Sequence, residues 1–116
     1  MATRTCTVTS DDQTDTVVWT GLLNGDDGQA FQAFSFRDQS IQFGGTFGVG
    51  GSISLEGSND STTWFVLSDL QTSAITKTSA ALEGVAEAVK FVRPRVTAGD
   101  GTTSLTATLY CARSVR

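Results

Sequence analysis

The amino-acid sequence predicts an all-β fold, a single-domain antiparallel β-sandwich over residues 1–116, with the jelly roll as the favoured topology. Three observations carry this prediction. Apolar and polar residues alternate over short stretches, and turn-forming residues separate those stretches. In addition, eighteen threonines and twelve serines make up about a quarter of the 116 residues. Threonine suits outward strand positions because its branched Cβ fits the extended backbone while its hydroxyl faces water.

The two ends of the chain show the alternation most plainly. Near the start, Arg4, Cys6 and Val8 alternate with threonines, and apolar residues from Leu105 to Cys111 alternate with polar ones near the end. A period of two residues is typical of a strand with one buried face. We therefore expect half-buried strands at both ends.

Further runs between the ends have the length and apolar pattern of strands. They cover residues 16–23, 30–36, 40–47, 52–57, 64–67, 75–78 and 90–97. Segments rich in glycine, asparagine and aspartate bound them, for example 24–28, 57–60 and 99–101, and such residues form tight turns. About nine short strands without long intervening helices favour antiparallel pairing.

One segment, 80–89, has the period of a helix. Leu82, Val85, Ala86 and Val89 lie at i, i+3, i+4 and i+7, and Ser79 is placed to cap the start. The segment is close to the shortest stable helix. We expect at most one short helix there, with an irregular crossing as the alternative.

Pro94 interrupts the run 90–97. Because proline has no N–H to donate to a ladder, it predicts an edge strand, a β-bulge or a strand start. Arg93 and Arg95 flank it on one face, with Val92 and Val96 on the other. Two arginines on one face suit bidentate binding of a carboxylate at an interface, and the alternative is an ordinary polar face.

Cys6 and Cys111 lie in the first and last predicted strands, on the parity that carries aliphatic residues. If those strands pair, a disulfide between them would close nearly the whole chain. The interpretation we favour is two reduced core thiols, as expected without an export signal. Two cysteines without histidine fall short of a zinc site.

The chain contains no histidine, which removes the imidazole of most catalytic bases and transition-metal sites. Asp69 with Glu83 or Glu87 is the nearest approach to a carboxylate pair, and nothing in the sequence fixes their separation. We predict that the protein is not an enzyme and that it binds no cofactor or metal.

The net charge and the hydropathy of the chain argue against two classes of partner. Twelve acidic and eight basic residues give a net charge of −4, so the chain lacks the basic surface that phosphate binding requires. No apolar run approaches the ~20 residues of a membrane span, and the N-terminus has no apolar signal core. We expect no nucleic-acid or membrane partner, and synthesis in a cytoplasm.

Two acidic segments, residues 11–15 and 24–28, are candidate partner contacts. We expect both to be exposed turns that offer negative charge to a partner. Calcium binding is the alternative, although the spacing of an EF-hand loop is absent. Together with the two arginines beside Pro94, these segments give the predicted interface residues: Asp11, Asp12, Asp26, Asp27, Arg93 and Arg95.

Seven phenylalanines are many for so small a core. We expect most of them to be buried, and one or two exposed ones would mark an association surface. Trp64 lies in an apolar run with Phe65, Val66 and Leu67, so we expect it in the core.

Two stretches resemble small virion structural proteins of tailed bacteriophages. Residues 52–64 carry a strand, an Asn59-Asp60 turn and Trp64, and residues 91–103 carry an arginine-containing strand and a Gly99-Asp100-Gly101 hairpin. The resemblance covers residues 44–110. It implies a jelly-roll head decoration (cement) protein on the outside of an icosahedral capsid, often a trimer where capsomers meet.

The turn before Trp64 is also similar to a strand pair of discoidin-like galactose-binding domains, and similar turns occur in phage tail and fibre modules. The alternative prediction is therefore a carbohydrate- or receptor-binding β-sandwich module of a phage tail or fibre.

These resemblances and the absence of catalytic groups lead to one expectation for function. We predict a non-enzymatic phage virion structural protein that binds the major capsid protein and stabilises contacts between capsid subunits. We expect a homo-oligomer, with a trimer favoured. Its expected place is the capsid exterior of the virion, after synthesis in the cytoplasm of the bacterial host.

Overall fold

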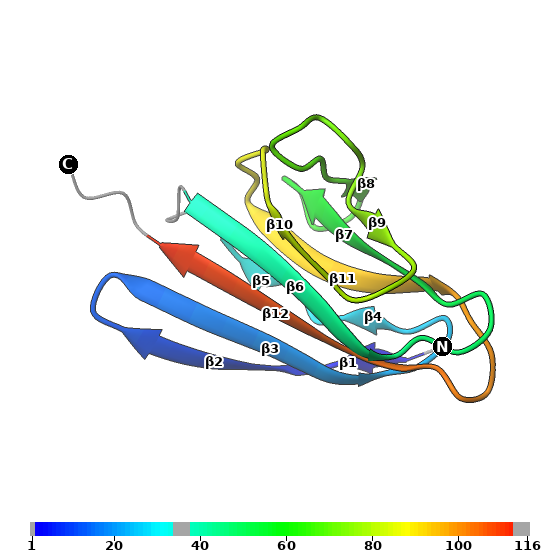
Figure 1. The fold of residues 1–116 in the computed structure, drawn as a ribbon. Helices are drawn as coiled ribbons and strands as arrows, with labels where there is room; N and C mark the ends of the chain where they lie inside the picture. Colours follow the sequence, from blue (N-terminus) through cyan, green and yellow to red (C-terminus); the bar gives the residue numbers. More distant parts are fainter. Residues whose placement is uncertain (1, 34–37, 113–116) are drawn as a thin grey trace.

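A computed structural model describes residues 2–33 and 38–112, which form two β-sheets packed face to face (Figure 1). Within those residues there is no helix. Sheet B has the order β10 (Ala81–Gly84), β6 (Asp38–Thr46), β12 (Ser104–Ala112), β3 (Thr14–Leu22) and β2 (Cys6–Asp11).

Sheet A is built mostly from shorter strands. Its order is β1 (Thr3–Arg4), β4 (Asp27–Gly28), β11 (Phe91–Ala98), β7 (Ser52–Ser58) and β8 (Phe65–Val66). In addition, β5 (Phe31–Gln32) pairs with β11, and β9 (Thr76–Lys77) pairs with β7. The β1–β4 pair is parallel and the other named pairs are antiparallel.

The order of pairing is that of a jelly roll. The strands from β3 to β7 pair in reverse order with those from β8 to β12: β3 with β12, β4 and β5 with β11, β6 with β10, and β7 with β8 and β9. A long hairpin rolled in this way produces two Greek keys. The predicted all-β sandwich and its jelly-roll topology are confirmed.

Alternating side chains from the two sheets fill the core. At the C-terminal end, Leu105, Ala107, Leu109 and Cys111 are all fully buried, as their alternation predicts. The N-terminal strand is different, because Val8 on β2 remains 44% exposed. Figure 1 shows the β2–β3 hairpin reaching beyond the strands of sheet A, which leaves the inner side of β2 uncovered.

The helix expected at 80–89 is wrong. Ala81–Gly84 forms β10, which pairs with β6 over four residues, and Val85 forms an isolated bridge with Asp69. Leu82 is 65% exposed, whereas the helical pattern would have buried it. Sheet hydrogen bonds to β6 outweigh the weak local helical preference of a short segment that contains Gly84.

The run expected at 30–36 is a strand only over Phe31–Gln32, with Ala33 N donating to Lys90 O at 2.8 Å. The rest of that prediction falls on residues 34–37, outside the described residues.

Pro94 lies in the middle of β11, a central strand of sheet A, where it pairs with Leu55 of β7. On the other side of β11 the neighbouring strand is interrupted, because β5 ends at Gln32 opposite Phe91 and β4 lies opposite Arg95. The missing N–H of proline therefore faces the gap between β4 and β5. Pro94 therefore lies in none of the three predicted places, which were an edge strand, a β-bulge and a strand start. The reason for the prediction still applies, because proline has no N–H to donate to a ladder.

Both cysteines are free thiols. The terminal strands β2 and β12 do not pair with each other, because β3 lies between them. Cys6 lies opposite Trp19 on β3, and Cys111 lies opposite Asp15. The favoured interpretation of reduced thiols is confirmed, although only Cys111 is fully buried.

Candidate functional site

The outer face of sheet A carries a compact charged cluster centred on Arg93. Arg93 Nε donates to Glu56 Oε1 at 3.0 Å, and Nη1 donates to Asp27 Oδ2 at 3.2 Å. The Trp64 ring covers the guanidinium, with its centroid 4.1 Å from Cζ. We call Asp27, Glu56, Trp64 and Arg93 the Arg93 cluster.

The strand register assembles this cluster. Arg93 on β11 lies directly opposite Glu56 on β7, and residues paired across an antiparallel ladder share a face. The Arg93, Glu56 and Asp27 side chains are only 17%, 10% and 13% exposed. Arg93 therefore binds Glu56 and Asp27 of its own chain. Trp64 is half-buried over the guanidinium and does not belong to the hydrophobic core.

Asp26 has a structural role of its own. Its carboxylate accepts hydrogen bonds from Arg4 Nε at 2.7 Å and from the amides of Leu23 and Ala2, each at 2.9 Å. Burial by itself raises the pKa of this carboxyl, but Arg4 and the two amides outweigh burial and hold the pKa below its ordinary value. The group therefore stays ionised and fastens the N-terminal strand to the loop after β3.

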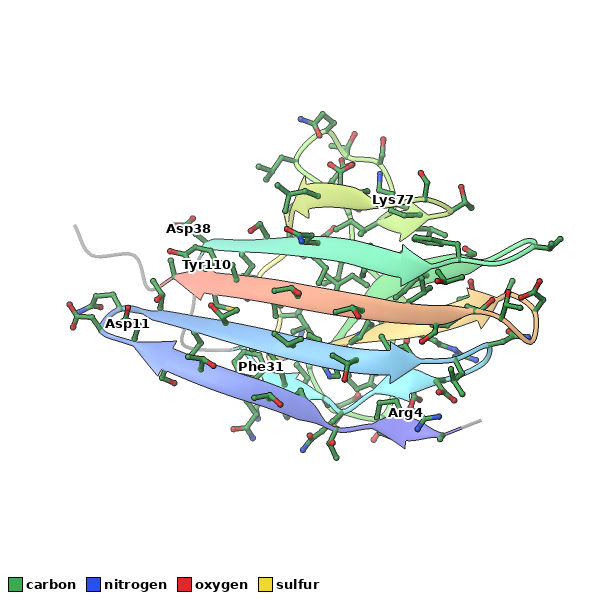
Figure 2. All side chains as sticks on the ribbon, turned by 60° about the horizontal axis from the view of Figure 1, so that its bottom comes forward. Arg4, Asp11, Phe31, Asp38, Lys77 and Tyr110 are labelled. Carbon is green, nitrogen blue, oxygen red and sulfur yellow. The ribbon has the colours of Figure 1, made fainter. Side chains whose placement is uncertain are left out.

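The six predicted interface residues fall into two places. Asp11 and Asp12 are exposed at the β2–β3 turn, and Figure 2 shows Asp11 at the far end of the molecule from Arg4. The other four lie at or beside sheet A. The expectation of an exposed turn is wrong for Asp26, which is 3% exposed, because its carboxylate is used to close the loop. It is also wrong for Asp27, which lies in β4 with its side chain 13% exposed and paired with Arg93.

Arg93 and Arg95 lie on one face of β11, as predicted. A clamp made by both arginines is nevertheless not available, because Glu56 and Asp27 already occupy Arg93. Arg95 is exposed and, within the part of the chain that the structure describes, has no ion-pair partner. Whether any of the six residues contacts a partner stays a prediction.

A cleft of ≈ 380 Å³ lies at the end of β7. Leu67 and Val89 line its apolar part, where both side chains pack against Gly57. Phe65 on its rim is 67% exposed, contrary to the expected core run 64–67. Phe65 and Val66, which form β8, are both exposed, and Leu67 after the strand is the buried member of that run. The continuous apolar stretch gave no sign of this division.

The turn at Asn59 and Asp60 forms the polar rim of this cleft. The Asp60 carboxylate accepts hydrogen bonds from the amides of Thr63 and Thr62 and from Ser58 Oγ, and these contacts lower its pKa. Asn59 Oδ1 accepts from the amide of Lys90 at 3.0 Å. Most of the oxygen atoms that a ligand would use are therefore engaged in building the turn.

The outer face of sheet B differs from that of sheet A because its middle carries no charge. Cross-strand pairing aligns Thr7, Val18, Thr108, Gln42 and Leu82 in one row. The next row consists of Thr9, Thr16, Tyr110, Ser40 and Gly84. We call these two rows the neutral face. Sequence alternation reveals which residues point outward, but the pairing that gathers them requires the sheet order.

Two classes of site have no candidate in the described residues. Over 2–33 and 38–112, no group of three or more cysteine, aspartate, glutamate or histidine side chains is placed to hold a metal ion. In the same residues, no helix is long and apolar enough to cross a membrane.

Comparison with solved structures places this fold beside phage-derived and cupin proteins. The chain is similar to the SPBc2 prophage-derived protein YomS, with a TM-score of 0.67 and 13% identity over 89% of this chain and 97% of that one. It is also similar to an RmlC-like cupin protein from Desulfovibrio desulfuricans, with a TM-score of 0.50 and 11% identity over 92% and 79% of the two chains.

No protein-family model and no curated protein sequence matches the chain. At identities this low, the structural likeness shows the fold alone. The protein therefore shares a β-sandwich fold with a phage-derived protein of nearly the same extent.

Proposed function

We propose that the protein is a non-enzymatic structural protein of a phage virion that binds the outer capsid surface and stabilises contacts between major capsid subunits. The neutral face is the docking surface in this proposal. Its support is the contrast between the two sheets, since the outer face of sheet A carries charged groups, of which Arg93, Glu56 and Asp27 bind one another, while the middle of sheet B presents only uncharged side chains. The fold shared with a prophage-derived protein agrees with a phage origin.

The size and chemistry of the neutral face suit a protein partner. The whole outer face of sheet B, with nine residues in each of its three central strands, six in β2 and four in β10, covers about 600 Å² at ordinary strand spacings, and the neutral face is its middle. A stable interface takes about 800 Å² from each partner, and its centre is depleted in charge. Tyr110, which is 47% exposed, is the kind of side chain that anchors interfaces, and Leu82, which is 65% exposed, adds apolar area.

Repeated copies strengthen such binding. On a symmetric shell, many modest contacts add through avidity, so each copy needs only moderate affinity. The resemblance to decoration proteins implies a trimer, and that oligomeric state stays a prediction.

The direct test is cryo-electron microscopy of the virion that carries this protein. Density for the jelly roll on the capsid exterior, with sheet B toward the shell, is the expected result. Its absence from the shell, or its presence only at a tail vertex, would refute the decoration role.

A binding assay with matched variants tests the docking surface itself. Gln42→Glu adds one negative charge to the neutral face, and Gln32→Glu adds the same charge to β5 of sheet A. We expect the first variant to bind purified capsids at least about tenfold more weakly and the second to bind as the parent does. Equal binding by both variants would show that another surface docks.

The carbohydrate- or receptor-binding alternative has one favouring observation, the cleft beside the Asn59-Asp60 turn with exposed Phe65 on its rim. Aromatic rings commonly pack against sugar rings, so a glycan array is the appropriate screen. Binding that Phe65→Ala abolishes, in a variant with unchanged melting temperature, would support this function. An array without hits would remove it.

A further inference from the structure

The cleft at the end of β7 combines an apolar floor with an acidic rim. Leu67 and Val89 form the floor, and Phe65 on the rim is 67% exposed. Asp60 and Glu87 line the same cleft, and no basic side chain is among the described residues that line it. Its volume of ≈ 380 Å³ is at the lower end of the range for binding sites. The cleft therefore suits a small apolar group that carries positive charge.

Each rim carboxylate is held in place by one oxygen and presents the other. Asp60 Oδ1 accepts hydrogen bonds from the Ser58 hydroxyl at 2.9 Å and from two amides of its own turn. Glu87 Oε1 accepts from the Ser68 amide at 2.7 Å. Over residues 2–33 and 38–112, no hydrogen bond or ion pair engages Asp60 Oδ2 or Glu87 Oε2. Two carboxylate oxygens in fixed positions are thus available to a cation.

The neighbouring basic side chains do not neutralise this rim. The Lys90 ammonium lies over the Phe91 ring, 5.5 Å from its centroid, and Arg93 is held by Glu56 and Asp27. In the described part of the chain, neither carboxylate of the cleft has an ion-pair partner. The opposite charge therefore has to come from a segment outside this part of the chain or from another molecule.

The last four residues of the sequence have the composition that this cleft requires. Residues 113–116 are Arg-Ser-Val-Arg and lie outside the described residues. They carry two of the eight basic residues of a chain whose net charge is −4. One apolar side chain between two cations matches an apolar floor with two carboxylates on its rim. Arginine also binds carboxylates through two parallel hydrogen bonds and packs on aromatic rings such as Phe65.

We propose that residues 113–116 of one copy bind in the cleft of a second copy. Val115 packs on the apolar floor, and Arg113 and Arg116 bind the two carboxylates of the rim. Strand β12 leads to these residues and ends on sheet B beyond the strands of sheet A, away from the cleft of its own chain (Figure 1). The contact joins two different surfaces, so the copies link head to tail and stop when they close into a ring.

The first experiment measures molar mass by light scattering of the full chain over a range of concentrations. An oligomer that dissociates on dilution is expected. Thr63→Lys adds a positive charge to the rim and leaves both carboxylates in place, and it is expected to weaken self-association at least about tenfold. Ser104→Lys adds the same charge at the start of β12, away from the cleft, and is expected to associate as the parent does. Melting curves establish that both variants fold.

Variants of the last four residues test the other half of the contact without changing the cleft. Arg113→Ser combined with Arg116→Ser removes both cations and is expected to weaken self-association by a similar factor. High salt is expected to weaken association of the parent as well, because it screens exposed charges. Unchanged association in both this double variant and Thr63→Lys would overturn the proposal.

Disulfide trapping locates the contact and remains informative if Thr63→Lys does not fold. In a Cys6→Ser background, Val115→Cys is combined with Val66→Cys, which places the second thiol in the cleft. Mild oxidation is expected to link residue 115 to residue 66 between chains, as identified by mass spectrometry. The control pairs Val115→Cys with Val49→Cys, which is 81% exposed outside the cleft, and no such link is expected.

Two further outcomes would overturn the proposal. One is a parent protein that is monomeric at every concentration, and the other is a link between residues 115 and 66 that forms only within single chains. None of these measurements involves a capsid, so the binding of residues 113–116 can fail while capsid binding holds, and the reverse.

Discussion

Some charged side chains in this protein stabilise the fold through ion pairs, and others remain exposed to solvent. Arg93 and Arg95 illustrate the division, because both point from the same face of β11 and, among the described residues, only Arg93 has an ion-pair partner. The sequence predicted their shared face correctly. It could not predict their different roles, because Asp27 and Glu56 reach Arg93 only after β4 and β7 take their places on either side of β11.

Substitution of these two arginines is expected to have very different effects. Arg93→Met leaves the largely buried Asp27 and Glu56 carboxylates without their cation and removes the group under Trp64, at a cost of about 2–4 kcal/mol in the free energy of unfolding. Arg95→Met is the matched control and is expected to change that free energy by less than about 0.5 kcal/mol. Urea denaturation measures both, and equal effects would contradict the assignment.

Asp100 is expected to make stability depend on pH. Its carboxylate accepts hydrogen bonds from the amides of Val49 and Thr102 and from the Thr102 hydroxyl, which lower its pKa from 3.8 to about 2. Because the folded-state pKa is the lower one, the ionised carboxylate stabilises the fold above the ordinary pKa, and this contribution is lost as the pH falls through about 2.

The Asp100→Asn variant isolates that contribution. At neutral pH we expect it to melt at a lower temperature than the parent, since the loop after β6 loses an acceptor for the Val49 amide. As the pH approaches 2, the difference in melting temperature is expected to shrink, because the parent carboxyl becomes protonated too. A difference that stays constant over this range would contradict the explanation.

At the scale of elements, the sequence predicted the long strands well and the short ones unevenly, because β5, β8 and β9 fall within predicted runs whereas β4 and β10 were not predicted as strands. The runs that became β3, β6, β7, β11 and β12 have clear alternation and closely match their observed ranges. Strand β10 was mistaken for a helix because Leu82 and Val85 satisfy a helical spacing by coincidence. Strand β1 falls within the alternation expected at the N-terminus, but its separation from β2 and its pairing with β4 were not predicted. Strand β4 is two residues long and depends on β1 and β11, so no local pattern predicts it.

The contact between β3, β4 and β11 depends on a glycine. A Cβ added at Gly28 would lie 2.6 Å from both Pro94 Cδ and Trp19 Cδ1, and neither ring can move without disturbing the core. We expect Gly28→Ala to reduce the free energy of unfolding by about 1–3 kcal/mol. Gly44→Ala on β6 meets no atom within 4 Å and is the control, expected to leave stability nearly unchanged. Thermal and urea unfolding of the pair test the prediction.

At the scale of the whole molecule, the jelly roll could be named in advance but its sheet order could not. Alternation fixes which side chains face inward, and turn residues fix where strands end. The rolled pairing of β3 with β12 and of β6 with β10 joins segments far apart in the chain, for which no single sequence carries a signal. The neutral face became visible only with that order.

The same long-range pairing is expected to make folding slow. Three of the four strand pairings of sheet B join distant segments, and proteins dominated by such contacts fold in milliseconds to seconds. Stopped-flow refolding can follow the fluorescence of Trp19, which is fully buried. Refolding that is complete within microseconds would contradict the expectation.

The gap opposite Pro94 has a consequence for local motion. Because β4 and β5 meet β11 on either side of a residue that cannot donate, each is free to detach without unzipping the other. Amide hydrogen exchange of the Asp26→Ala variant is expected to accelerate at Asp27 and Gln29, whose amides bond to Ala2 and Arg4, while Ala33 keeps its parent rate. A single proline thus separates this margin of the sandwich into two independently opening units.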